Sequence, residues 1–216
     1  MKKFNIFCCG VGGQGIITLG QILKMAAIDA DLRVVGTETR GATQREGSVS
    51  ATVRYGIPEE SDKEVGASLE RQALYAVRLL SGSADVLIAS EPMEGIRYLN
   101  FAGPQTTIVI NEYPMPLKEH LSGDVHYPTK EEYIEIMKKF SPKVFTYNAN
   151  MKSKELFNSF LQMNIVLLGF AMGCTPDFPV TIDVMKKTLE KTWPKAVETN
   201  EKALMAGYEE GKKALS

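Results

Sequence analysis

Short apolar runs alternate with amphipathic segments through the first two thirds of the chain. The first run, residues 4–9, leads into a glycine-rich turn, after which apolar residues recur at helical spacing over 15–30. A second run at 33–38 completes the order strand, helix, strand, which predicts a β-α-β unit of a parallel sheet. Further continuous apolar runs predict strands at 84–89, 106–111 and 143–147.

Strict alternation marks one more strand. Over residues 48–55, Val49, Ala51, Val53 and Tyr55 fall on one side, which predicts a strand with one buried face. A Pro-rich stretch with both histidines, residues 113–128, shows no sustained period and predicts a long surface loop.

Helices account for most of the rest of the chain. Pro92 at a first helical position predicts a helix over 91–101. Thr129 with Glu132 three positions later forms a capping box and predicts a helix that begins there. Beyond residue 153 the pattern is mostly helical, with helices predicted at 155–174, 182–192 and 196–213.

These elements predict an α/β fold that is Rossmann-like. A mostly parallel sheet is flanked by helices, and the C-terminal part from about residue 150 to residue 216 is helical. The chain has 216 residues, of which 44% are hydrophobic, so it can bury a sizeable core. We expect a single domain that spans residues 1–216.

The charge and hydropathy of the chain argue against binding to nucleic acid and to membranes. The chain has 25 basic and 26 acidic residues, and its formal charge of -1 favours neither nucleic acid nor an anionic membrane surface. The longest apolar stretch, 165–174, falls well short of the roughly 20 residues that span a bilayer. A cytoplasmic location is therefore expected.

The cysteines and histidines do not follow a metal-binding pattern. Cys8 and Cys9 are adjacent and Cys174 is distant, whereas zinc and iron–sulfur ligands come in spaced sets. We expect all three to be small buried residues in a reducing compartment. His120 and His126 lie six residues apart, which matches no established ligand spacing, so no metal site is predicted.

The glycine-rich turn carries the first candidate chemistry. Its sequence, between a strand and a helix, is Gly10-Val11-Gly12-Gly13-Gln14-Gly15. This satisfies G-x-G-x-x-G, and Glu38 ends the next strand near the position of a ribose-binding acid, which indicates dinucleotide binding. Glycines let the backbone approach a pyrophosphate beside the positive end of a helix. The bulky amide of Gln14 inside the turn argues against NAD or FAD.

A second polar, glycine-flanked segment follows Glu38 and includes Arg40, Gln44 and Arg45. Consecutive β-α loops of a parallel sheet emerge at the same edge, so we expect this segment to lie beside the glycine turn. Two roles remain open for Arg40, Arg45 and Arg54. They contact a ligand phosphate or a partner subunit, or they form structural ion pairs with Glu38 and Glu46.

Read together, the two segments resemble a known family, the gamma subunits or domains of the 2-oxoacid–ferredoxin oxidoreductases. That family is marked by G-x-G-G-Q-G, here residues 10–15, and by E-x-x-G-x-x-Q-R-x-G-x-V, here residues 38–49. The family usually has Gln-Arg-Gly-Gly where this chain has Glu46 between Arg45 and Gly47.

Within the family, the chain is similar over nearly its whole length to the beta subunits of indolepyruvate–ferredoxin oxidoreductases. The residues that carry this likeness are Glu91-Pro92-Met93-Glu94, Arg97-Tyr98-Leu99, Val109-Ile110-Asn111, Tyr127-Pro128 and 164–169.

The resemblance implies a heteromeric enzyme of aromatic amino acid catabolism. Its large subunit carries thiamine diphosphate, Mg²⁺ and [4Fe-4S] clusters, decarboxylates an aryl 2-oxo acid, and passes electrons to ferredoxin and the acyl group to coenzyme A. The present chain is expected to hold none of these cofactors alone and to be inactive alone. The resemblance names no catalytic residue in it, and whether the glycine turn contacts coenzyme A, another nucleotide or the partner subunit stays open.

Two further functions are compatible with the same residues. The chain is a stand-alone nucleotide- or flavin-binding protein that uses the glycine turn, or it is an assembly scaffold with an empty turn. A subunit that covers a partner exposes apolar surface when isolated, so we expect a homodimer or larger species in isolation. Glu91 and Asn111 follow strand ends, where ligand sites of α/β sheets form. Acids such as Glu91 and Glu94 in a first helical turn are also ordinary partners of the helix dipole.

Overall fold

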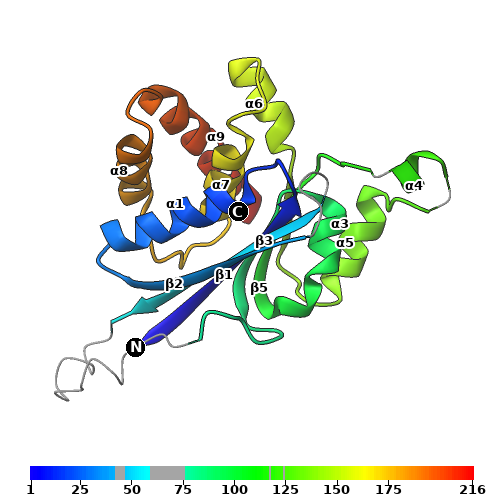
Figure 1. Ribbon diagram of the computed structural model, residues 1–216, viewed down its shortest axis with the longest axis horizontal. Helices are drawn as coiled ribbons and strands as arrows, with labels where there is room; N and C mark the ends of the chain where they lie inside the picture. Colours follow the sequence, from blue (N-terminus) through cyan, green and yellow to red (C-terminus); the bar gives the residue numbers. More distant parts are fainter. Residues whose placement is uncertain (42–46, 59–75, 117, 124) are drawn as a thin grey trace.

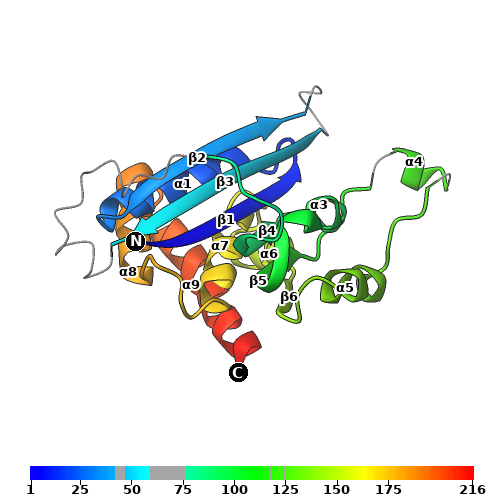
Figure 2. The ribbon, with the colours of Figure 1, turned by 90° about the horizontal axis from the view of Figure 1, so that it is seen from below.

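Six strands form one sheet in the order β2-β3-β1-β4-β5-β6 in the computed structural model (Figures 1 and 2). The structure describes residues 1–41, 47–58, 76–116, 118–123 and 125–216. The strands are β1 (Lys2–Val11), β2 (Arg33–Arg40), β3 (Ser48–Ile57), β4 (Ala84–Ala89), β5 (Ala102–Asn111) and β6 (Val144–Tyr147). The helices are α1 (Ile16–Asp29), α3 (Pro92–Arg97), η2 (Leu99–Phe101), α4 (Lys118–Leu121), α5 (Lys130–Lys138), α6 (Ala149–Phe157), α7 (Met163–Gly173), α8 (Ile182–Thr192) and α9 (Val197–Leu215).

The strand β3 changes the expected start of the sheet. It lies between β1 and β2 and pairs antiparallel with both, while β1, β4, β5 and β6 pair in parallel. The first β-α-β unit therefore does not place its two strands side by side. Because β2 still runs in the direction of β1, both strands end at the same edge, and the sheet remains mostly parallel and Rossmann-like.

Helices cover both faces of the sheet and enclose two apolar cores (Figures 1 and 2). The larger core packs β1 and β3 against α1, α7 and α8, and it includes the predicted inward face of β3 from Val49 to Tyr55. The smaller core packs the other face against α3 and α5. Successive side chains of a strand point to opposite faces, so Cys8 enters the larger core and Cys9 the smaller.

Local signals fixed several helix boundaries. Thr129 and Glu132 form the predicted capping box at the start of α5. The helix predicted at 91–101 is shorter, because α3 ends at Arg97 and a 3-10 turn follows. The single helix predicted at 155–174 is wrong: Asn158 adopts a left-handed conformation with φ 52°, which ends α6 before α7 begins.

The backbones of α7 and α9 contact each other directly in the larger core. A Cβ atom added at Gly169 would lie 2.0 Å from the carbonyl oxygen of Leu204, and one at Gly207 would lie 1.9 Å from that of Val166. Gly173 and Gly211 meet in the same way one turn further on. Only glycine permits this backbone-to-backbone contact.

None of the helices formed by the described residues combines the length and apolar character needed to cross a bilayer.

Candidate functional site

The glycine turn, residues 10–15, connects the end of β1 to the start of α1. Gly13 and Gly15 have φ of +99° and +76°, a region that side chains with a Cβ rarely adopt. A Cβ at Gly10 would lie 2.7 Å from Gln14 Oε1, and a Cβ at Gly15 would lie 2.4 Å from Asn164 Nδ2. The glycines therefore allow the chain to fold back on itself and to meet α7.

The side chain of Gln14 closes this turn. Its Oε1 accepts a hydrogen bond from the backbone N–H of Val11 at 2.8 Å, and its Nε2 donates to the carbonyl oxygen of Ser90 at 3.1 Å. Nε2 also contacts Met115 Sδ at 3.0 Å. The Gln14 amide thus ties the turn to Ser90 after β4 and to Met115 in the segment after β5.

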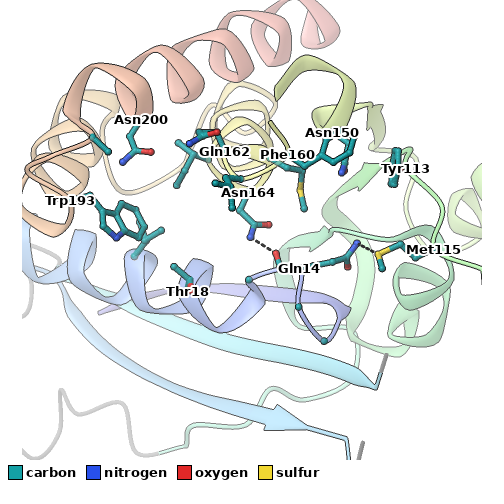
Figure 3. Close-up of a pocket in the computed structure, with 18 residues that line it drawn as sticks. Gln14, Thr18, Tyr113, Met115, Asn150, Phe160, Gln162, Asn164, Trp193 and Asn200 are labelled. Atoms are coloured by element: carbon teal, nitrogen blue, oxygen red, sulfur yellow. Dashed lines mark hydrogen bonds between the residues drawn. The ribbon is translucent and has the colours of Figure 1, made fainter. Parts of the chain in front are cut away.

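Asn164, at the start of α7, secures the turn from the opposite side. Its Nδ2 donates a hydrogen bond to the carbonyl oxygen of Gln14, and its Oδ1 accepts one from Ser90 Oγ at 3.4 Å. Figure 3 shows the Gln14 and Asn164 amides at the centre of the site. Residues from three separate parts of the chain hold the turn in one conformation.

The 38–47 segment reaches the glycine turn as expected. The backbone N–H of Gly12 donates to the carbonyl oxygen of Gly47 at 2.8 Å. Arg40, Val49 and Gly10 lie in one row across β2, β3 and β1. The segment connects β2 to β3 and is not a β-α loop, so the expected type of connection was wrong. Its expected position beside the glycine turn is confirmed at Gly47. Gln44 and Arg45 lie outside the described residues.

The described residues show the partners of two of the predicted charges, while Arg45 and Glu46 lie outside the described residues. Among the described residues, Glu38 Oε1 pairs with Lys24 Nζ of α1 at 3.0 Å. Arg54 Nε donates to Asn5 Oδ1 at 3.0 Å, near the opposite end of β1, so Arg54 is remote from the turn. Arg40 is exposed at the end of β2.

Asn111, at the end of β5, is fully buried at the same sheet edge. Its Nδ2 donates to the carbonyl oxygen of Ser90 at 3.0 Å and to Asn150 Oδ1 at 2.7 Å, while its Oδ1 accepts from the N–H of Ala149 at 3.0 Å. Asn111 thus lies at the sheet edge as expected from the strand end, and whether it serves a site stays a prediction. Its hydrogen bonds organise the start of α6.

Glu91 links α3 to the segment after β5. Its Oε2 accepts from the N–H of Glu94 at 2.8 Å, which caps α3, and its Oε1 accepts from the Tyr127 hydroxyl and, at 3.4 Å, from the N–H of Met115. Burial raises the pKa of the Glu91 carboxyl above its usual value. Both Glu91 and Glu94 are engaged within the fold, because Glu94 accepts from Ser48 and from Arg97 Nε.

A cavity of about 890 Å³ opens between the glycine turn and the C-terminal helices. In Figure 3, Trp193, Thr18 and Asn200 lie at one end, and Tyr113, Phe160 and Met115 lie at the other. The Gln14–Asn164 contact lies between these two ends. None of the described residues that line the cavity carries a charge.

Sequence reasoning did not single out several residues of this cavity, among them Asn150, Gln162, Trp193 and Asn200. Amides in helices are usually exposed, and only the fold shows that Asn150 and Asn200 are buried, at 7% and 6% exposure. The one available signal was Trp193, the single tryptophan of the chain.

Metal-binding groups do not gather within the part of the chain that the structure describes: no three His, Cys, Asp or Glu side chains come close enough to hold an ion. His126 Nε2 instead meets Glu132 Oε2 at 2.8 Å.

Comparisons with known proteins agree with the fold and reach the whole chain. The family model described as pyruvate ferredoxin/flavodoxin oxidoreductase matches residues 5–210. The chain is 34% identical over 218 residues to an indolepyruvate oxidoreductase subunit IorB of Pyrococcus horikoshii, covering 100% of both chains. It is 35% identical over 207 residues to the subunit of the same name in Archaeoglobus fulgidus, covering 95% of this chain and 94% of that one.

Two solved structures share the fold. The gamma subunit of a keto/oxoacid ferredoxin oxidoreductase from Geobacter sulfurreducens superposes with a TM-score of 0.66 at 21% identity, covering 98% of this chain and 99% of that one. A 2-oxoglutarate:ferredoxin oxidoreductase from Magnetococcus marinus gives 0.66 at 20% identity, covering all of this chain but 31% of that one. The fold thus occurs both as a separate subunit and as part of a longer chain.

Proposed function

Because the chain belongs to the pyruvate ferredoxin/flavodoxin oxidoreductase family, we propose that it is the small subunit of an indolepyruvate–ferredoxin oxidoreductase. The assembled enzyme decarboxylates indolepyruvate or a related aryl 2-oxo acid, passes electrons to ferredoxin and transfers the acyl group to coenzyme A. Residues 1–216 form one gamma-type domain of that enzyme. The observation that carries this proposal is the full-length match to subunits named for that activity, at 34% identity.

The glycine turn and the 38–47 segment form the face that meets the large subunit. This proposal is supported by the hydrogen bond between Gly12 and Gly47, which makes one surface of two segments that are distant in sequence. Arg40, exposed beside this surface, offers a charged donor to a partner. The residues proposed for this face are Gly10, Gly12, Gly13, Gln14, Gly15, Glu38, Arg40, Gln44 and Arg45.

The cysteines of this chain do not fit an iron–sulfur cluster. A cluster needs thiolates, but burial raises the pKa of Cys8 and of Cys174 to about 12. Cys8 and Cys9 also point to opposite faces of the sheet. The clusters that electron transfer to ferredoxin requires therefore belong on the large subunit.

We propose for a similar reason that the large subunit holds thiamine diphosphate and Mg²⁺. Glu91 and Glu94, the buried carboxylates at the sheet edge, are occupied by hydrogen bonds from Tyr127, Ser48 and Arg97. They offer no free oxygen pair to a cation. Coenzyme A acts as the acyl acceptor of the assembly, and the described residues that line the cavity of this chain include no cation for its phosphates.

The test is indolepyruvate-dependent ferredoxin reduction by the chain co-expressed with a large subunit that carries thiamine diphosphate. We expect turnover from the complex and none from the isolated, colourless chain. A complex that turns over no aryl 2-oxo acid contradicts the proposed activity. A flavin or dinucleotide bound to the isolated chain at stoichiometric level favours a stand-alone binding protein, and assembly without any effect on turnover favours a scaffold.

Variants test the proposed face separately. Arg45→Ala removes a charged donor, whose hydrogen bond is typically worth about 1.5–3 kcal/mol, so turnover or assembly should fall about tenfold or more. Gly12→Val should act in the same direction by blocking the backbone contact with Gly47. Arg78→Ala is the matched control, because Arg78 is exposed beside Arg54 at the far end of β1. Normal turnover of an assembled Arg45→Ala complex would remove Arg45 from this face.

A further inference from the structure

Two side chains of α3 and its C-terminal end hold the hydroxyl of Ser48, the first residue of β3. Ser48 Oγ donates a hydrogen bond to Glu94 Oε2 and lies 2.9 Å from the hydroxyl oxygen of Tyr98, which ends the helix. A serine hydroxyl has one proton, so the oxygen that donates to Glu94 accepts from Tyr98. The helix lies beside the end of β1, where β3 begins (Figures 1 and 2).

The Glu94 side chain has little freedom to move. It is only 6% exposed, and its other oxygen, Oε1, accepts from Arg97 Nε at 2.9 Å. The helix that carries it packs closely on the sheet, because a Cβ atom added at Gly95 would lie 3.0 Å from side chains of β4, β5 and α5. Glu94 therefore offers Ser48 an acceptor at a fixed position.

Ser48 lies where the glycine turn and the 38–47 segment join. Its carbonyl oxygen accepts from the N–H of Gly41 at 2.8 Å. The carbonyl oxygen of the preceding residue, Gly47, accepts from the N–H of Gly12, also at 2.8 Å. Both hydrogen bonds that join the two segments therefore end within one residue of the Ser48 hydroxyl.

Many other contacts hold the elements that this hydroxyl connects. The strand β3 pairs with β1 over its whole length and with most of β2 on its other side. A hydroxyl and a carboxyl group cost more to bury than apolar groups of the same size, and replacing a buried polar pair by apolar groups is often neutral or stabilising. What the Ser48 contacts add to β3 is a defined position for its first residue.

We propose that Glu94 and Tyr98 are positioning residues for the face that meets the large subunit. Through the Ser48 hydroxyl they fix the start of β3, and with it the carbonyl oxygens that bind the N–H groups of Gly12 and Gly41. Their effect on partner binding rests on the proposed function, whereas their effect on these two hydrogen bonds concerns this chain alone.

Variants that change single hydroxyl groups test the proposal. Ser48→Ala removes the hydroxyl and keeps the backbone. Ser48→Thr retains the hydroxyl, suits a strand, and adds a methyl group for which there is room in the cavity of about 70 Å³ that Ser48 lines with Glu91 and Tyr127. Ser83→Ala is the matched control, because Ser83 Oγ donates to the carbonyl oxygen of Leu80 just before β4, at the opposite sheet edge.

The first readout is native-state hydrogen exchange of the isolated chain. In Ser48→Ala the N–H groups of Gly12 and Gly41 should exchange about tenfold faster than in the parent chain, because their acceptors are held less firmly. The N–H of Ile108, a fully buried residue of β5, reports overall stability and should change less. Ser48→Thr and Ser83→Ala should leave the exchange of Gly12 and Gly41 unchanged.

A double-mutant cycle assigns the effect to Glu94. Glu94→Gln replaces one acceptor oxygen by an amide NH₂, so Ser48 and Arg97 cannot both keep their acceptor. It should speed the exchange of Gly12 in the parent chain but add little in the Ser48→Ala chain, where the contact is already lost. An equal effect in both chains would show that Glu94 acts by another route and would overturn the proposal.

The second readout is the dissociation constant of the complex with the large subunit, measured by calorimetry. The apparent constant rises as fewer molecules hold the binding conformation, so Ser48→Ala should bind about threefold or more weakly, and Ser48→Thr like the parent chain. Unchanged exchange of Gly12 and Gly41, or undiminished assembly by a folded Ser48→Ala chain, overturns the proposal. A parent chain that does not assemble contradicts the proposed function instead, and the exchange rates then decide whether Glu94 fixes this surface.

Discussion

The side-chain amide of Asn164 donates a hydrogen bond to the carbonyl oxygen of Gln14, 150 residues earlier in the chain. This contact places the start of α7 directly against the glycine turn, where Gly15 has no room for a Cβ atom. The turn is therefore shaped by the C-terminal half of the protein as much as by its own glycines.

Gly15→Ala should destabilise the chain more than Gly13→Ala. Both positions have positive φ, which costs an alanine about 1–2 kcal/mol. A Cβ at Gly13 meets nothing within 4 Å, whereas one at Gly15 lies 2.4 Å from Asn164 Nδ2, and such overpacking adds about 1–3 kcal/mol. Urea unfolding of the two variants measures the difference. Adding Asn164→Ala to Gly15→Ala should recover part of the loss; equal stabilities of Gly13→Ala and Gly15→Ala would contradict the proposed clash.

The Glu91 carboxyl should make the free energy of unfolding decrease as pH rises above 4.5, the ordinary pKa of a glutamate. The folded chain holds this carboxyl proton more tightly, because burial raises its pKa. Below pH 4.5 the carboxyl is protonated in both states. As pH rises, the unfolded chain releases the proton first, so the stabilisation is lost until pH passes the folded pKa. We expect Glu91→Gln to remove this decline.

The measurement is the free energy of unfolding from urea titrations at a series of pH values from 4.5 to 8. Glu131→Gln, at an exposed position of α5, is the control for loss of a carboxylate. If the profiles of the parent chain and Glu91→Gln run parallel, Glu91 does not contribute in this way.

The cysteine thiols should be inert in the folded chain. All three are buried, and burial raises the pKa of each, so little thiolate forms near neutral pH. Ellman's reagent should titrate three thiols in denaturant and react with them only slowly under native conditions. Incubation with iron and sulfide should yield no [4Fe-4S] spectrum. Rapid native reaction would show that the thiols are accessible.

Self-association of the isolated chain should depend on the α6–α7 connection. Leu161 is 86% exposed and Phe160 is 44% exposed beside the cavity, and such apolar surface favours association. Sedimentation velocity should show a dimer or larger species that Leu161→Ser weakens. Leu80→Ser, at a residue 79% exposed elsewhere, is the control. A monomeric parent chain contradicts the expectation.

The periodicity of the sequence predicted most elements but not the order of the strands. The alternation over 48–55 correctly placed Val49 to Tyr55 in the core. It carried no information on pairing partners, so the insertion of β3 between β1 and β2 was not foreseen. Pairing depends on contacts between distant residues, and hydrophobic pattern reports only which face is buried.

Some residues of the candidate site could likewise be predicted from the sequence, and others could not. The glycine turn was visible because its residues are consecutive, and the position of Glu91 and Asn111 followed from strand ends. The burial of Asn200 could not be predicted, since it depends on α9 packing against α7 and α8. The break at Asn158 was missed because a single left-handed residue leaves the hydrophobic period almost unchanged.

The glycine contacts between α7 and α9 also limit how the cavity can move. With backbone against backbone at Gly169 and Gly207, neither helix can slide or rotate without a steric clash, so the two behave as one rigid body. Asn164 on α7 and Asn200 on α9 therefore keep a fixed spacing during thermal motion. Changes in the shape of the cavity are therefore easier at lining residues outside this helix pair, such as Thr18 of α1 and Tyr113 after β5.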